Sequence, residues 1–234
     1  MKINKFRLSK IVGEAALIFV SVFIAIWLES EWQNRADETE AMVALSQLLA
    51  ELRADQEFEE QVRLDQMAFV ETTEKILLWL ENSESLPQES VQETVDEFTT
   101  PLTIWPRRAA WTTMVASGQL ALIDDKSLVA RLGDLYEYRL RRLIYNGEGY
   151  DSSVEEIGLQ FIPEIWDFRR HELLTSDYER IAAFHGKVRW VNEWAHWYLN
   201  SLADYNKALN ELIVDVEKYL QNHGAATGVS SRSS

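Results

Sequence analysis

The sequence predicts an all-α protein in which one N-terminal transmembrane helix continues into a helical-bundle domain with a long C-terminal heptad helix. Three observations predict this fold class. Glycine (9) and proline (4) are scarce among 234 residues, which disfavours a turn-rich β protein. A long apolar run follows a basic N-terminus. Apolar residues then recur at helical spacing through the rest of the chain.

The composition limits the class of protein. With 47% hydrophobic residues, nine Trp, eight Tyr and nine Phe, the chain has enough apolar material for one packed core. The formal net charge is −15, and the cations within residues 1–10 leave the remainder more acidic still. Because contacts from Lys and Arg to phosphate dominate nucleic-acid affinity, we expect no nucleic acid as a partner. Cysteine is absent, which excludes disulfides and thiolate chemistry.

Residues 11–28 read IVGEAALIFVSVFIAIWL and predict a transmembrane helix whose partner is the lipid bilayer. These 18 residues would span about 27 Å as a helix, close to the thickness of a hydrocarbon core. The run is longer than the apolar part of a cleaved signal peptide, and bulky residues occupy its exit. It is also apolar on every side, unlike a core helix of a soluble protein.

The charges that flank residues 11–28 predict the orientation. Lys and Arg within residues 1–10, and acidic residues directly after the run, favour a cytoplasmic N-terminus in the inner (cytoplasmic) membrane of a bacterium. Residues 29–223 then form an extracytoplasmic helical domain. Glu14 is the one ionisable group in the predicted span. Two interpretations of it stay open: a functional contact at membrane depth, or a shallow position that reaches the headgroups.

Residues 29–80 contain neither glycine nor proline and are expected to continue the helix beyond the membrane. Two arrangements are open for this segment: one unbroken helix, or a hairpin that turns within residues 53–57. Polar residues and a proline at positions 82–88 then predict a loop.

The middle of the chain carries several signals for helix ends. Pro106 suits a first helical position, Gly118 a left-handed C-cap, and Asp124 or Asp125 the N-cap of the next helix. Asparagine and two glycines at positions 146–149 predict a turn after that helix.

The last helix has the sharpest periodicity. Ten apolar or aromatic residues alternate at spacings of three and four, which is typical of a heptad seam: Val188, Val191, Ala195, Tyr198, Leu202, Tyr205, Leu209, Leu212, Val216 and Tyr219. Such a seam packs against other helices of an intramolecular bundle or, as the alternative, against a second copy of the chain. Residues 224–234 are small and polar and are expected to be disordered.

The search for chemistry yields no catalytic constellation and no cofactor motif. Glu193 and His196 have the spacing of two metal ligands on one helix face, but no second such pair exists, so we predict no metal site. A row of tryptophans and two arginines remain as candidates for binding a ligand or a partner: Trp190, Trp194, Trp197, Arg107 and Arg108.

Two stretches resemble a family of bacterial single-pass membrane proteins that is described only as a domain of unknown function. The first is Gly13-Glu14 at the start of the apolar run, followed by a long acidic helix. The second comprises Trp111-Thr112-Thr113-Met114, Ser117-Gly118-Gln119-Leu120, Ile123, Leu128 and Leu132. The resemblance covers nearly the whole chain. It implies the same topology and brings no activity, substrate or catalytic residue.

These observations favour a non-enzymatic, membrane-anchored interaction or sensing module that binds another protein or another copy of itself. Strong helical periodicity without a catalytic constellation supports this hypothesis. The alternative is a ligand-binding or enzymatic bundle whose pocket is lined by the tryptophans and arginines named above.

Overall fold

A computed structural model describes residues 5–82, 98, 103–167, 169–170, 172–174 and 177–227; the side chains of residues 5–16, 172–173 and 224–227 lie outside that description. The described chain is all-α apart from one pair of two-residue strands. Its elements are α1 (Lys5–Asn82), α3 (Ala109–Ser117), η1 (Gln119–Leu122), α4 (Lys126–Gly133), η2 (Asp134–Leu140), α5 (Arg141–Glu156), η3 (Ile157–Phe161), α6 (Ile162–Ile165), β1 (Trp166–Asp167), β2 (Glu172–Leu173) and α7 (Tyr178–Thr227).

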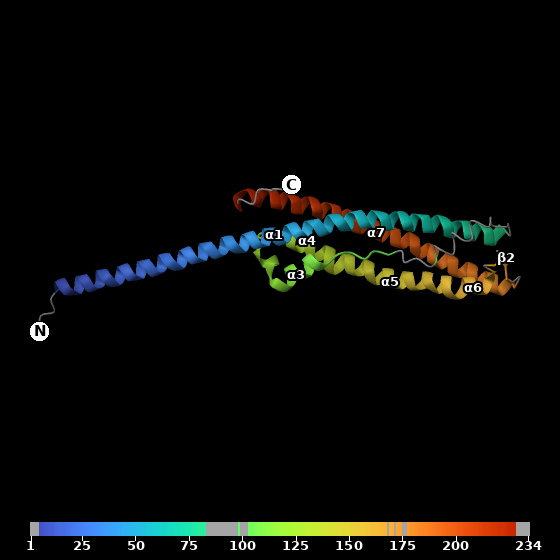
Figure 1. The fold of residues 1–234 in the computed structure, drawn as a ribbon, viewed down its shortest axis with the longest axis horizontal. Helices are drawn as coiled ribbons and strands as arrows, with labels where there is room; N and C mark the ends of the chain where they lie inside the picture. Colours follow the sequence, from blue (N-terminus) through green and yellow to red (C-terminus); the bar gives the residue numbers. More distant parts are fainter. Residues whose placement is uncertain are drawn as a thin grey trace.

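Helix α1 is a single helix of 78 residues, so residues 29–80 form no hairpin and residues 53–57 contain no turn. The absence of glycine and proline between positions 14 and 86 explains why nothing breaks it. Its N-terminal part extends as a lone rod beyond the bundle (Figure 1).

Among the residues that the structure describes, no helix is both long enough and apolar enough to cross a membrane. The side chain of Glu14 and those of the other residues before position 17 lie outside the described part. The transmembrane segment at residues 11–28 therefore stays a prediction.

The elements from α4 to α6 follow one another without a gap from Lys126 to Ile165 and form a second rod, here called the central rod. Two stretches of it, η2 and η3, are π-helical. The turn predicted at residues 146–149 is wrong, because these residues lie inside α5.

The glycines of α5 and η3 serve close packing instead of a turn. A Cβ atom on Gly147 would lie 3.0 Å from Cβ of Thr103, and one on Gly158 would lie 2.5 Å from the carbonyl oxygen of Phe98. The two glycines are three helical turns apart and therefore share a face. Their missing side chains make room for Phe98 and Thr103.

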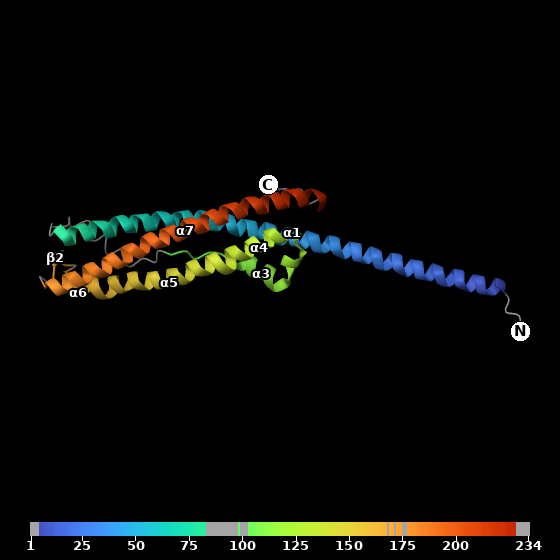
Figure 2. The same ribbon diagram turned by 180° about the vertical axis from the view of Figure 1, so that it is seen from behind.

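Helix α7 confirms the heptad prediction. Nine of the ten seam residues are buried, and Tyr219 is partly buried against the same core. The seam packs mainly within the chain, because α7 and α1 lie side by side along the bundle with the central rod against α7 (Figures 1 and 2). Helix α7 runs to Thr227, and residues 228–234 lie outside the described part, so the disordered tail at residues 224–234 stays a prediction.

Two of the predicted caps are confirmed. Gly118 closes α3 with a φ of 78°, and Asp125 accepts a hydrogen bond from the Leu128 amide (2.9 Å) at the start of α4. Asp124, the other candidate for this cap, instead accepts from the Tyr219 hydroxyl (2.7 Å). The prediction for Pro106 is wrong: α3 starts at Ala109, and residues 104–108 lie outside any helix.

Candidate functional site

Two carboxylates of α1 hold the start of α3. Asp55, only 1% exposed, accepts hydrogen bonds from the Arg107 amide (3.0 Å) and from its guanidinium (3.4 Å). Glu51 accepts from the Ala110 amide (2.9 Å). The side chain of the N-cap residue Arg108 accepts no hydrogen bond from the first turn of α3. Carboxylates of α1 therefore accept the hydrogen bonds of the amides near the start of α3. Because the Arg107 amide donates to Asp55 of α1, residues 106–108 are held against α1, outside the helix.

Glu59 lies one turn further along α1 and is fully buried. Its Oε2 accepts a hydrogen bond from the Asn206 side chain on α7, and its Oε1 has no partner among the described residues. Burial raises the pKa of Glu59, and the hydrogen bond from Asn206 opposes this shift. Burial likewise raises the pKa of Asp55, against the opposing contribution of Arg107.

Two tyrosines complete this buried region. Tyr136 comes from η2 and Tyr205 from α7, and neither hydroxyl has a partner among the described residues. Burial raises the pKa of both phenols above its ordinary value of 10.0, and the negative charge of Asp55 adds to the shift in each. We call Asp55, Glu59, Tyr136 and Tyr205, together with the partly buried Asn206, the buried polar layer. Unpartnered buried polar atoms are uncommon in proteins, and π-helical turns are frequent at functional sites.

A surface groove lies over this layer between the central rod and α7. Its volume is about 340 Å³, and Tyr205 of the buried polar layer forms part of its lining. The other lining residues are mostly polar or aromatic: Tyr138, Arg139, Arg142, Leu143, Asn146, Trp197, Ser201 and Asp204. The groove is therefore the solvent-facing side of the region where η2 meets α7.

The three tryptophans predicted from the sequence lie in different environments on α7. Trp197 lines the groove and is 39% exposed, whereas Trp190 is 59% exposed. Trp194 lies between them, in an edge-to-face contact with Trp190 (ring centroids 5.7 Å apart) and 6.0 Å from the ring of Tyr150. Trp194 is thus part of the packing between α5 and α7.

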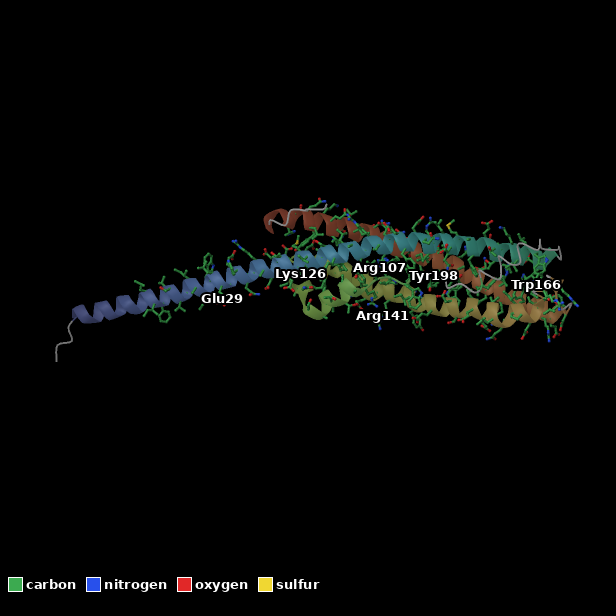
Figure 3. The ribbon with its side chains drawn as sticks, in the orientation of Figure 1. Glu29, Arg107, Lys126, Arg141, Trp166 and Tyr198 are labelled. Carbon is green, nitrogen blue, oxygen red and sulfur yellow. The ribbon has the colours of Figure 1, made fainter. Side chains whose placement is uncertain are left out.

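The two predicted arginines lie elsewhere. Arg107 pairs with Asp55 beside α1 (Figure 3), and Arg108 lies 3.6 Å from Glu137. Within the described residues, no hydrogen bond, ion pair or ring contact joins either arginine to a tryptophan of α7. The arginines that lie with Trp197 in the groove are Arg139 and Arg142.

The described residues contain no group of three or more His, Asp or Glu side chains that could hold a metal ion. His196, which has metal-ligand spacing with Glu193, instead lies 3.5 Å from Glu74 of α1.

The buried polar layer escaped the sequence prediction, although a signal for it exists. Asp55 and Glu59 are four residues apart on α1 and lie on the same helix face as Leu52 and Val62, which are both buried. Two carboxylates that interrupt an apolar stripe in this way indicate a polar contact inside a bundle.

Comparisons with known proteins give one match. A family model with the description "Family of unknown function (DUF6090)" matches residues 14–161, from α1 to the end of η3. No curated protein and no solved structure matches the chain.

Proposed function

The chain belongs to the DUF6090 family of unknown function, and we propose that it is a membrane-anchored, extracytoplasmic helical module for interaction or sensing. One observation carries the proposal: ten of the twelve residues of α1 from Leu17 to Leu28 are exposed large apolar side chains, interrupted only by Ser21 and Ala25. Phe19 is 80% exposed and Phe23 is 74% exposed. Twelve residues make more than three helical turns, so the ten large apolar side chains cover every side of this segment.

A lipid bilayer is the environment that best suits this apolar segment. Apolar surface in water is unfavourable by about 25 cal/mol per Å², and a helix that is apolar all round is typical of a membrane span. The apolar run extends back to Ile11 in the sequence, which gives the length that a bilayer needs. Cations before the run and acidic residues after it favour an extracytoplasmic bundle.

The bundle stands away from the proposed membrane surface. Gln119 of η1 donates a hydrogen bond to Glu40 of α1 (2.8 Å), and the next residues of α1, Ala41 and Met42, are buried. Between Leu28 and Glu40, α1 is largely exposed and forms a stalk of roughly 18 Å. Because the same helix continues into the bundle, a force or displacement at the bundle would reach the membrane through helical backbone.

Membrane fractionation tests the anchor. We expect the full chain to sediment with membranes, to resist extraction by alkaline carbonate and to be released by detergent. A variant without residues 1–28 should stay in the supernatant. Release of the full chain by carbonate alone would contradict integral insertion.

Labelling of introduced cysteines tests the orientation, and the native chain gives no background because it has no cysteine. Ser152 is exposed on α5, and Ser9 precedes the apolar run. A membrane-impermeant maleimide applied to spheroplasts should label Ser152→Cys and spare Ser9→Cys until the membrane is opened. The reverse pattern would place the bundle in the cytoplasm.

A further inference from the structure

One face of α1 repeats every seven residues and is buried inside the bundle. Eleven residues at alternating spacings of four and three form this face, here called the α1 seam: Ala41, Leu45, Leu48, Leu52, Asp55, Glu59, Val62, Gln66, Phe69, Thr73 and Ile76. All of them are at most 5% exposed. Helix α7, which carries its own heptad seam, lies beside α1 and runs in the opposite direction (Figures 1 and 2).

An apolar heptad repeat does not by itself fix the position of one helix along another. When α7 slides along α1 by seven residues, about 10.5 Å, each apolar residue of one seam meets an equivalent position of the other seam again. The apolar contacts between the two helices therefore permit more than one register. The residues that distinguish the observed register must be those that interrupt the apolar repeat.

Two polar residues of the α1 seam pair with α7. Glu59 accepts a hydrogen bond from the Asn206 side chain, and the Thr73 hydroxyl accepts one from the Asn192 side chain (2.8 Å). Fourteen residues separate Glu59 from Thr73, and fourteen separate Asn192 from Asn206. Both pairs therefore belong to one register of two antiparallel helices. We call Glu59 with Asn206 and Thr73 with Asn192 the register pairs.

A slide of seven residues breaks both register pairs. It would place Leu199 or Ile213 opposite Glu59, where Asn206 lies in the observed register. Asn206 is the one hydrogen-bond partner of the Glu59 side chain among the described residues. A fully buried carboxyl group that meets an aliphatic side chain is strongly unfavourable. Buried polar pairs between helices are known to specify register at a cost in stability.

From these features we infer that the register pairs fix α7 at one position along α1. Their role is to select the register, since the burial of Glu59 itself costs stability. The inference as such needs no membrane. Its consequence rests on the proposed anchor: a displacement of α1 relative to the membrane would carry α7 with it, because α7 cannot slip along α1.

Cysteine cross-linking measures the register directly, because the native chain contains no cysteine. Glu74 on α1 and His196 on α7 lie opposite each other, with 3.5 Å between their side chains, so Glu74→Cys/His196→Cys reports the observed register. Glu74→Cys/Arg189→Cys and Glu74→Cys/Ala203→Cys report slides of seven residues at exposed positions. A short bifunctional thiol reagent is applied to the full chain in mild detergent. The two shifted pairs should cross-link at least about tenfold less than the first.

The variant Glu59→Leu/Thr73→Val/Asn192→Leu/Asn206→Leu replaces both register pairs by apolar side chains. Because both partners of each pair are removed together, the bundle should stay folded, with a urea midpoint at least as high as that of the wild type. The shifted cysteine pairs should then cross-link several-fold more than they do in the wild type. Glu59→Gln is the matched control: it keeps an acceptor for Asn206 and should keep the single register.

Two results would overturn the inference. Shifted cross-links as abundant as the first in the wild type would mean that α7 slides freely. A single register in the apolar variant, with circular dichroism showing a folded bundle, would assign the register to other contacts of α7. Thr73→Val/Asn192→Leu alone decides in the same way if the fourfold variant does not fold. Only cross-links within one chain, separated by mass from those between chains, are counted. Membrane fractionation is independent of these results, so the anchor and the register pairs can fail separately.

Discussion

The carboxyl group of Glu59 is fully buried between α1 and α7, and burial raises its pKa above the ordinary 4.5. The folded chain therefore holds this proton to a higher pH than the unfolded chain does. Protonated Glu59 therefore stabilises the folded chain at low pH. This contribution is lost as pH rises from about 4.5 through the raised pKa of Glu59. Above that window the buried charge destabilises the bundle.

We predict that Glu59→Gln raises the melting temperature at pH 8 by a few degrees, equivalent to about 1 kcal/mol. A glutamine keeps an acceptor for Asn206 without carrying charge. The gain should shrink as pH falls toward 4.5. Thermal melts followed by circular dichroism between pH 4.5 and 8 measure this difference.

Glu60→Gln is the matched control on the neighbouring residue. Glu60 is exposed, and a hydrogen bond from Arg63 lowers its pKa, so its stabilising effect is lost as pH falls. The two variants should thus show opposite trends with pH. If the melting temperatures of Glu59→Gln and the wild type depended on pH in the same way, Glu59 would not carry a buried charge.

The tyrosines of α7 allow a second comparison at single residues. The Tyr205 hydroxyl has no partner among the described residues, whereas the Tyr198 hydroxyl accepts a hydrogen bond from the Ile104 amide (3.1 Å). Tyr198→Phe should lose about 1–3 kcal/mol, because it leaves a buried amide without an acceptor. Tyr205→Phe should be neutral or slightly stabilising in urea unfolding. A loss for Tyr205→Phe equal to that for Tyr198→Phe would instead indicate a hidden partner of the Tyr205 hydroxyl, such as a bound water.

At the scale of elements, apolar periodicity predicted the heptad helix because burial there follows one strict repeat. The same method could not identify the buried polar layer, since it assigns charged residues such as Asp55 and Glu59 to the surface. It also took the glycines at positions 146–149 for a turn. Glycine signals both turns and close backbone approach, and only the partner segment, here the one carrying Thr103, distinguishes them.

Substitution of the glycines in the central rod tests this explanation. Gly158→Ala would place Cβ within 2.5 Å of the Phe98 carbonyl oxygen, so we expect a loss of about 2 kcal/mol in the free energy of unfolding. Gly133→Ala meets nothing within 4 Å in the same rod and should gain up to about 1 kcal/mol from helix propensity. Urea unfolding measures both. If both variants gained stability, the close approach at Gly158 would be excluded.

At the scale of the whole molecule, one helix connects the apolar N-terminal segment with the far end of the bundle. The stalk is largely exposed between Leu28 and Glu40, and most of it extends beyond the bundle (Figure 1). Its rigidity therefore depends on its own helical hydrogen bonds, supported by local pairs such as Arg35 with Glu31 (3.3 Å). Isolated helices of this length are marginal in water, so tethering at both ends is what should keep the stalk helical.

Spin labels on introduced cysteines at Ser30 and Ser46 can measure this rigidity. Sixteen residues of unbroken helix separate their Cα atoms by about 24 Å, and we expect a narrow distance distribution near that value in detergent or bilayer. Ala36→Pro removes a backbone donor in the middle of the stalk and should broaden the distribution. The melting temperature of the bundle should stay unchanged, because Ala36 is exposed and precedes the first buried residues of α1, Ala41 and Met42. A broad distribution without the proline would mean that the stalk bends freely, and a signal could then not pass through it as helix displacement.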